Sequence, residues 1–574
     1  MTSARDPDLS TVNPHRVDAP PIDGARVDAA RVDGSRIDGA CVDAVRVDES
    51  RVDGARVEGS RIDGACVGAV RVDESRVDGA RVDGSRVDGS RVDGACVDAV
   101  RVDTPPIDGV CVDAVRVDGP RIDGVDVELV NVDAVDVEVA DGDSGGVDCC
   151  GGEPAAVVLA RWVAGLDFTL LPNTVVEAAR EHLIDAVGCA VAGIGRGAAE
   201  PALTVARGLG GPPEARLFSG ARVGAVAAAF GNAVAVHALD FDDTHAGGLV
   251  HASAVTVPVA LAVGEQTGAR GSEMITALVA GLEVVCRLGA SAPHGFHARG
   301  LHATSMCGVV GAAVTAGKLI GLDETRLAHA IGIAASGASG LLEFLHSPAS
   351  TKQLHPGTAA ANGILAARLA AAGATGPAGA LDGEYGLFRT MTTREPDRDL
   401  LLGELGERWE TTRIGIKPYP ACQLTHASID AAGEFTGSTP SALIVTLHPD
   451  AVPIVGGLEK RRPRSAYQAR FSVYWCVAAM VVDGRVDLDT FEDLDRPEIL
   501  DLAARTTVRA GAADVVAADA PGIVEGDGRT ARVERPTGGR ARTKAAANLG
   551  PGAEAVFAAV DPVSLLDAIE GCLS

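Results

Sequence analysis

The chain has few aromatic residues, and it lacks the motifs of nucleotide-binding, zinc-binding and disulfide-rich proteins. Aromatic residues make up 3% of its 574 residues, so its core must depend on close packing of Ala, Gly and Val. No Gly-x-Gly-x-x-Gly motif follows a predicted strand, and no Walker-type phosphate loop occurs. The twelve cysteines lack metal-ligand spacing and the density of a disulfide scaffold. We therefore expect no nucleotide cofactor, no zinc site and no disulfide framework.

Basic charge and long apolar runs are also scarce. The net charge is -27, of which residues 1–150 contribute -16 through 17 Arg against 33 Asp plus Glu. General nucleic-acid binding is not expected, because phosphate contacts need Lys and Arg. The N-terminal MTSARDPDLS lacks the basic and apolar regions of a signal peptide, and apolar runs such as 223–236 are too short to span a bilayer. The sequence predicts a cytoplasmic protein without a membrane partner.

Residues 16–139 form a repeat with a period of five. A Val or Ile stands at every fifth position from Val17 to Val137, which gives 25 consecutive units such as ARVDG and SRVDG. This period fits neither a helix nor an ordinary strand, and so regular a repeat indicates a solenoid. The tract resembles the pentapeptide-repeat family, whose right-handed β-helix places four units in each coil. The resemblance implies about six coils for this tract.

Two interpretations of this tract remain open. The family favours Leu or Phe where this chain has Val, and Asp or Asn where it has Arg. In a β-helix, stacking about 4.8 Å apart would place Arg over Arg and Asp over Asp. The alternative is a low-complexity tract that stays disordered. In either case we expect a spacer or surface-presenting arm, with a disordered terminus at 1–15 and a linker at 140–153.

The pattern becomes helical from residue 154. Apolar residues recur at i, i+3 and i+4 spacing with Arg and Glu on the opposite face. Helices are predicted at 155–166, 175–194, 223–238, 252–267, 272–288, 304–320, 324–335 and 359–372. Strand-like runs occupy 442–448, 506–509 and 531–534, with a helix at 471–482 between them. We predict a mainly α fold with an all-α domain (154–414), a smaller α/β domain (415–545) and a C-terminal helix (546–574) that returns to the α domain.

Four segments of this second part carry ionisable side chains that a helical scaffold does not require. They are HALDFDDTHAGGLVH from residue 237, HGFHARGLHATS from 294, HSPASTKQLHPGTAAANG from 346 and IKPYPACQLTH from 416. Two of the chain's five lysines lie in these segments, which in an acidic protein indicates a pocket for an anionic substrate. Acid–base chemistry on a carboxylate needs these types, with His or Asp to move a proton and Lys to bind carboxylates. A metal site is not expected, since no His-Glu-x-x-His or compact His/Cys set occurs.

The motifs LDFDDTH, RGLHATS, STKQLHPG and KPYPACQLTH, in this order and spacing, resemble the MmgE/PrpD family over about residues 155–574. The resemblance implies an all-α domain with an α/β lid, a homodimer, and a lyase that needs neither metal nor organic cofactor. Its substrate would be a small di- or tricarboxylate that undergoes dehydration or decarboxylation, by carbon–oxygen or carbon–carbon cleavage. By the same resemblance, His251 and His302 would move protons with the help of Asp240. Lys352 and Lys417 would grip the substrate carboxylates.

Two departures from the family pattern bear on substrate choice. Trp475 stands where the family often has Tyr, with Tyr474 one position earlier, and Cys422 stands where some relatives carry His. We assign Cys422 and Tyr474 to the substrate-binding set. The other polar residues of the four segments are interpreted as supports of the fold or as solvated loop residues, namely His237, Asp242, Asp243, His294 and His297. The alternative function is that of a catalytically impaired homologue, kept for binding or scaffolding through its repeat arm.

Overall fold

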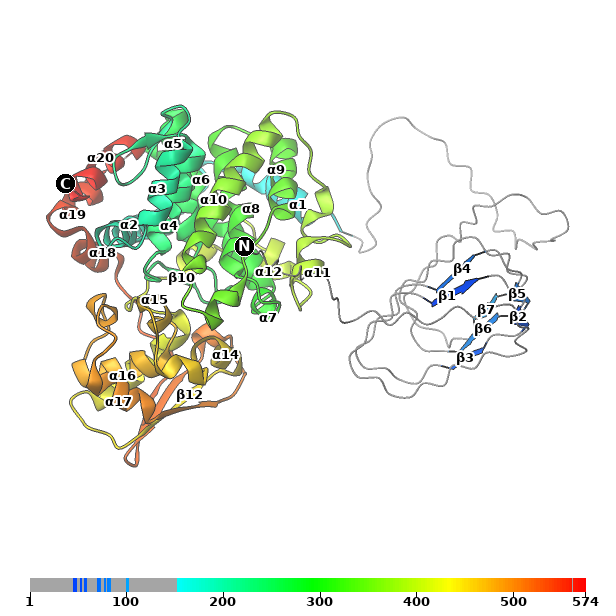
Figure 1. The fold of residues 1–574 in the computed structure, drawn as a ribbon. Coiled ribbons are helices and arrows are strands. Elements are labelled where there is room, and N and C mark those ends of the chain that lie inside the picture. Colours follow the sequence, from blue (N-terminus) through cyan, green and yellow to red (C-terminus); the bar gives the residue numbers. More distant parts are fainter. Residues whose placement is uncertain are drawn as a thin grey trace, which may run out of the picture. The chain divides into compact units, whose positions relative to one another are not determined.

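The computed structural model describes residues 152–559 and 561–573 and, before them, seven short strands between residues 45 and 102 (Figure 1). The chain divides into two compact units, residues 1–142 and residues 143–574. The second unit holds all the helices of the described residues and all four ionisable segments.

The strands of the first unit pair in parallel, β1 with β4, β2 with β5, β3 with β6, and β6 with β7. They are β1 (Val45–Asp48), β2 (Val52–Asp53), β3 (Arg56–Glu58), β4 (Val70–Asp73), β5 (Val77–Asp78), β6 (Ala80–Asp83) and β7 (Val100–Val102). Val45 lies opposite Val70, a step of 25 residues or five repeat units, whereas Ala80 lies opposite Val100, a step of 20 residues or four units. The rest of the repeat, the N-terminal 1–15 and most of the linker lie outside the described residues. The β-helix and its disordered alternative both stay predictions.

Twelve of the helices among the described residues belong to the large domain, and their order confirms the mainly α prediction. They are α1 (Ala155–Gly165), α2 (Asn173–Gly195), α3 (Glu200–Leu209), α4 (Ala225–His237), α5 (Ala252–Thr267), α6 (Gly271–Ser291), α7 (Gly295–Ala298), α8 (Ala303–Leu319), α9 (Glu324–Ser336), α10 (Thr351–Ala371), α11 (Leu387–Met391) and α12 (Arg398–Leu402). Helix α10 begins at Thr351, eight residues before the predicted start at 359. Its first turns hold Pro356 and few apolar residues, so hydrophobic periodicity alone could not reveal them.

Helix α8 lies at the centre of the large domain and packs against α5, α6, α9 and α10. Small residues stand where these helices approach most closely. A β-carbon added to Gly363 of α10 would lie 2.3 Å from the Ala312 β-carbon and 2.7 Å from the Val309 carbonyl oxygen of α8. The low aromatic content predicted this kind of core, in which helix backbones come close because no large side chain keeps them apart.

Helix α6 is, among the described residues, the one helix long and apolar enough to cross a membrane by length and composition. Its apolar stretch is 94% buried inside the folded chain. Helices α8 and α5 pack against it, so its apolar character is accounted for by its place in the core.

The smaller domain contains a four-stranded sheet in the order β13-β12-β14-β15. The strands are β12 (Leu443–Leu447), β13 (Thr506–Ala510), β14 (Gly522–Gly526) and β15 (Arg529–Val533). The pair β12–β13 is parallel, and the other two pairs are antiparallel. Helix α13 (His426–Ala432) packs on β14 and β15 and against α16 (Val473–Asp483), which in turn packs on α17 (Pro497–Ala504). Strand β14 was not predicted, because two of its five residues are glycines.

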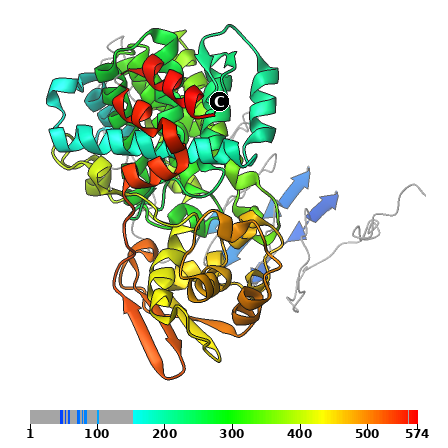
Figure 2. The ribbon, with the colours of Figure 1, turned by 90° about the vertical axis from the view of Figure 1, so that its left-hand side faces the viewer.

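The chain leaves the small domain and ends on the large one (Figure 2). Helix α18 (Ala541–Leu549) packs against α2, and after α19 (Ala553–Ala558) helix α20 (Pro562–Leu573) packs against α2 and α5. The return therefore takes place at α18, slightly before the predicted boundary at 546. This arrangement places Lys544 of α18 beside the loop that follows α4.

The close approach of α10 to α8 makes Gly363 a sensitive position. We expect Gly363→Ala to lower the free energy of unfolding by about 1–3 kcal/mol, because the added methyl meets backbone atoms that cannot move independently. Gly208→Ala at an exposed position of helix α3, where nothing lies within 4 Å of the new methyl, should be neutral or stabilise by about 0.5–1 kcal/mol. Urea unfolding of both variants measures the difference. Equal effects would contradict the packing argument.

Candidate functional site

Four segments of the chain, from the large domain and from the approach to the small one, build the site. The segment 237–251 runs from the last residue of α4 to the start of α5. His302 precedes α8, and Lys352 is the second residue of α10. Strand β10 (Thr244–His245) pairs antiparallel with β11 (Ile414–Gly415), which brings Lys417 to the same loop. Residues far apart in the sequence thus meet at one place.

Asp240 lies between two ammonium groups. Its Oδ1 accepts a hydrogen bond of 2.9 Å from Lys352 Nζ and one of 3.2 Å from Lys417 Nζ, and its backbone oxygen accepts another of 2.9 Å from Lys417. Burial would raise the pKa of this carboxyl, but the two lysines hold it well below its usual value. Its φ of 51° is left-handed, a region that Asp tolerates better than most residues. The carboxylate is therefore charged, and the ion pairs hold its backbone in an uncommon conformation.

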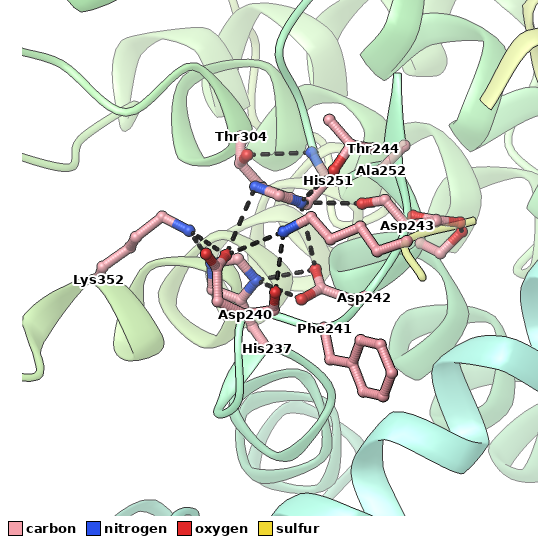
Figure 3. A network of polar contacts seen from close by, with 12 residues as sticks. His237, Asp240, Phe241, Asp242, Asp243, Thr244, His251, Ala252, Thr304 and Lys352 are labelled. Atoms are coloured by element: carbon pink, nitrogen blue, oxygen red, sulfur yellow. Dashed lines mark hydrogen bonds and ion pairs between the residues drawn. The ribbon is translucent and has the colours of Figure 1, made fainter. Parts of the chain in front are cut away.

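His237 connects Lys352 to a second carboxylate (Figure 3). Lys352 Nζ lies 3.0 Å from His237 Nε2, and His237 Nδ1 lies 2.8 Å from Asp242 Oδ2. An ammonium group can only donate, so Nε2 accepts and the ring proton is on Nδ1, which donates to Asp242. Burial and the neighbouring Lys352 lower the pKa of His237 well below its usual value, in agreement with a neutral ring. His237 and Asp242, interpreted as supports of the fold, therefore position a predicted site residue.

His251 has the protonation that a general base needs. Its Nδ1 lies 2.8 Å from the backbone oxygen of Asp243, which can only accept, so the ring proton is on Nδ1. The Nε2 atom then carries a lone pair and lies 3.9 Å from Asp240 Oδ1. Burial, together with Lys417 and Lys352, lowers the pKa of His251 well below its usual value. The result is a neutral imidazole whose side chain lines a cavity.

His302 pairs with another histidine that the sequence did not single out as a site residue. Its Nδ1 lies 3.1 Å from Nδ1 of His355, so one ring donates to the other. Burial and Lys352 lower the pKa of both rings, that of His355 to about 4. When His355 donates, the proton of His302 is on Nε2; when His302 donates, Nε2 carries a lone pair. The pair can therefore present His302 as an acid or as a base.

A cavity lies against these residues. Its polar lining consists of His251, His297, His302, Lys352, Cys422 and Gln423. His297 was interpreted as a solvated loop residue, and this was wrong, because the side chain lines the cavity. Burial and the neighbouring His294 lower its pKa to about 3. His297 lies in the short helix α7, and its membership of the ionisable segment from 294 was the sequence signal for this role.

The structure places the other predicted site residues outside this lining. Lys417 is fully buried and bound to Asp240, so its contacts are with that carboxylate and not with the cavity. Tyr474 is also absent from the lining, because α16 directs its hydroxyl to the Gly456 carbonyl oxygen at 2.7 Å. Its assignment to the substrate-binding set is therefore corrected: Tyr474, like Trp475, belongs to the small domain's core. Cys422 does line the cavity, and burial raises the pKa of its thiol to about 11.

Four residues of the site bring together nitrogen and oxygen atoms of the kinds that bind metal ions. Nitrogen or oxygen atoms of His237, Asp240, Asp242 and His251 lie within 4.8 Å of one another. However, Lys352 already occupies His237 Nε2 and Asp240 Oδ1, and Lys417 also binds Asp240. Two ammonium groups repel a further cation, so this arrangement fits an anionic substrate better than a metal ion.

A second buried network supports the loop from outside the cavity. Lys544 of α18 lies 2.8 Å from Asp185 Oδ1 and donates to the backbone oxygen of Phe241. His182 Nδ1 lies 2.8 Å from Asp243 Oδ2. The C-terminal part of the chain thus holds the residue between Asp240 and Asp242.

Comparisons with known proteins cover the same part of the chain. Profiles of the MmgE/PrpD N-terminal and C-terminal domains match residues 157–399 and 419–548. The cis-aconitate decarboxylase of Aspergillus terreus is 29% identical over 379 residues, which cover 61% of this chain and 77% of that protein. That of Homo sapiens is 30% identical over 292 residues, covering 48% of this chain and 60% of the relative. The cis-aconitate decarboxylase-like protein oryM of Aspergillus oryzae is 28% identical over 380 residues, which cover 61% of this chain and 78% of that protein.

The ion pair at Lys544 should contribute strongly to stability. We expect Lys544→Met to lower the free energy of unfolding by about 3–5 kcal/mol at pH 7.5, because Asp185 would remain buried without its partner. Burial already raises the pKa of Asp185 to about 6, so its protonation should reduce the loss as the pH falls to 5.5. Urea unfolding at both pH values tests this, with Arg542→Met on the exposed face of α18 as control. A loss that does not depend on pH would contradict the buried-charge argument.

Proposed function

Since the chain belongs to the MmgE/PrpD family, we propose that it is a cofactor-independent lyase of the dehydratase or decarboxylase type, acting on a small polycarboxylate. The observation that carries the proposal is the neutral His251, whose Nε2 lone pair lies 3.9 Å from Asp240 Oδ1, the atom that Lys352 binds, at a cavity lined by both His251 and Lys352. A base next to a fixed positive charge suits the removal of a proton from the carbon next to a carboxylate, and the same charge stabilises the carbanion that remains when CO2 leaves.

Dehydration and decarboxylation both require the site to stabilise negative charge on the substrate, and dehydration also requires His251 as a base. In dehydration, His251 Nε2 takes the proton α to a carboxylate, and the electron pair of the C–H bond delocalises into that carboxylate. It then forms the C=C bond as hydroxide leaves, and an acid protonates the hydroxide to water. In decarboxylation, the C–C bond to the departing CO2 supplies the electron pair, and an acid then protonates the carbon. In both, enolate-like charge develops and must be stabilised.

Lys352 is suited to stabilise this charge. It lines the cavity and binds Asp240 and His237, which direct its ammonium group. Lys417 is buried and binds Asp240, so it adds positive potential without contact with the substrate. The role assigned to Lys417 thus changes from a grip on substrate carboxylates to the positioning of Asp240.

His302 is the proposed acid. As the Nε2 proton of His302 passes to the leaving hydroxide or to the substrate carbon, the Nδ1 proton of His355 moves to His302 Nδ1, so His302 stays neutral. His355, which is partly exposed, then takes a proton from water. The ring centroids of His251 and His302 are 6.2 Å apart and both side chains line the cavity, so a base and an acid face the same space. The decarboxylase names of the relatives favour decarboxylation of an unsaturated tricarboxylate such as cis-aconitate. The homodimer and the cytoplasmic location stay predictions.

Loss of either histidine should abolish most of the activity. We expect His251→Ala and His302→Ala to lower kcat/KM by about 10²–10⁴-fold, the usual contribution of general acid–base catalysis. Product formation from cis-aconitate, citrate and 2-methylcitrate, followed by chromatography, measures it. His346→Ala, at an exposed histidine outside the cavity lining, serves as the matched control and should keep full activity. If the unaltered protein turns over none of these acids, the impaired-homologue alternative replaces this proposal.

The pH profile should report the lowered pKa of His251. A base with the ordinary pKa of about 6.5 would lose roughly tenfold in kcat/KM between pH 7.5 and 5.5, because it becomes protonated. Here burial and the two lysines keep His251 neutral, so we expect kcat/KM to stay nearly constant over that range. In Lys352→Met the acid limb should move to higher pH, because one of the charges that lower the pKa is gone. An inflection near pH 6.5 in the unaltered enzyme would refute this assignment.

A further inference from the structure

We infer that the substrate of this chain carries an apolar substituent of several carbons in addition to its carboxylates. The inference rests on the proposed function, because it concerns the same cavity and takes the polar wall as the reacting end. It adds a specificity subsite that neither the motifs nor the names of the relatives assign.

Apolar side chains from both domains line the rest of the cavity. The large domain contributes Leu249 and, from the 3-10 helix Leu342–His346, the side chains of Leu342, Phe344 and Leu345. The small domain contributes Leu424, Ile454 and Phe471. Such a surface gains free energy when a substrate covers it with carbon and loses it when a charged group is placed there.

The positive charge at the cavity is small for a compact polyanion. Lys352 is the one Lys or Arg among the lining residues of the described chain, and Asp240 already pairs with it. Burial keeps the lining histidines His251, His297 and His302 neutral by lowering their pKa values. The thiol of Cys422 is neutral as well. A substrate with carboxylates on all sides would place at least one of them against apolar carbon.

The apolar wall begins directly beside the cation. Lys352 Nζ lies 5.2 Å from the centre of the Phe471 ring, and the rings of Phe471 and Phe344 are 5.7 Å apart. A carboxylate held by Lys352 therefore has two aromatic rings next to it. An alkyl group attached near that carboxylate would lie along these rings toward the leucines and Ile454.

Binding of a series of 2-alkylsuccinates to the intact chain tests the inference. Methyl-, propyl- and hexylsuccinate share one dicarboxylate end and differ in the apolar part, and titration calorimetry gives their Kd values. We expect Kd to fall about fourfold per added methylene until the subsite is full, from the usual value of a buried CH2. Affinity that stays constant or weakens with chain length would overturn the inference and would show that the apolar wall only excludes water.

Matched variants locate the subsite. Ile454→Asn places a polar group at the cavity, whereas Ile444→Asn makes the same change on β12, where the isoleucine is 37% exposed. We expect the first to reduce the gain per methylene at least twofold while methylsuccinate binds as before, and the second to leave the series unchanged. Leu342→Asn, at a partly exposed lining residue of the other domain, repeats the test should Ile454→Asn fail to fold. An unchanged series in a folded Ile454→Asn or Leu342→Asn would also count against the inference.

The outcome separates this inference from the proposed function. Turnover of cis-aconitate together with flat succinate affinities would keep the lyase and reject the apolar subsite. If affinity rises with chain length but the protein turns over neither plain nor alkyl-substituted polycarboxylates, the apolar subsite is supported and the lyase function is rejected.

Discussion

The carboxylate of Asp240, held between the ammonium groups of Lys352 and Lys417, is the interaction on which the rest of the site depends. It joins three parts of the chain, namely the loop after α4, the start of α10 and the segment after β11. All three side chains are buried, so removal of one partner would leave an uncompensated charge in a medium of low dielectric constant. The loop therefore keeps its left-handed backbone at Asp240 because two cations hold it there.

Burial and the same charges explain the state of the histidines. Burial, together with the two ammonium groups, disfavours protonation of His237 and His251, and the hydrogen bonds to Asp242 and to the Asp243 carbonyl then select the Nδ1 proton. This ion cluster thus orients Lys352 and helps to keep His251 neutral. The Nε2 lone pair of His251 remains available at the cavity. Local hydrogen bonds decide which nitrogen of each ring can act.

Much of this site could be predicted from the sequence, because its residues lie in segments that a helical scaffold alone would not require. His251, His302 and Lys352 do meet at one cavity, with Asp240 behind them. His355 and His297 were missed as site residues, since nothing in a one-turn helix or at the start of a longer one tells which way an imidazole points. Tyr474 was placed wrongly for a related reason: adjacent helical residues point about 100° apart, and its hydroxyl reaches Gly456.

The sequence by itself determined the helical architecture, the small-residue core and the set of side chains able to do acid–base chemistry. Periodicity and composition are local properties, and neighbouring residues suffice to read them. Only the tertiary structure decided which charges neutralise one another, because Lys352 and Asp240 are 112 positions apart and Lys417 and Asp240 are 177 apart. It turned Lys417 from an expected substrate ligand into the partner of Asp240, and surrounded the remaining cation with apolar side chains. Distance and burial set those pairings, and neither is encoded in the spacing of residues along the chain.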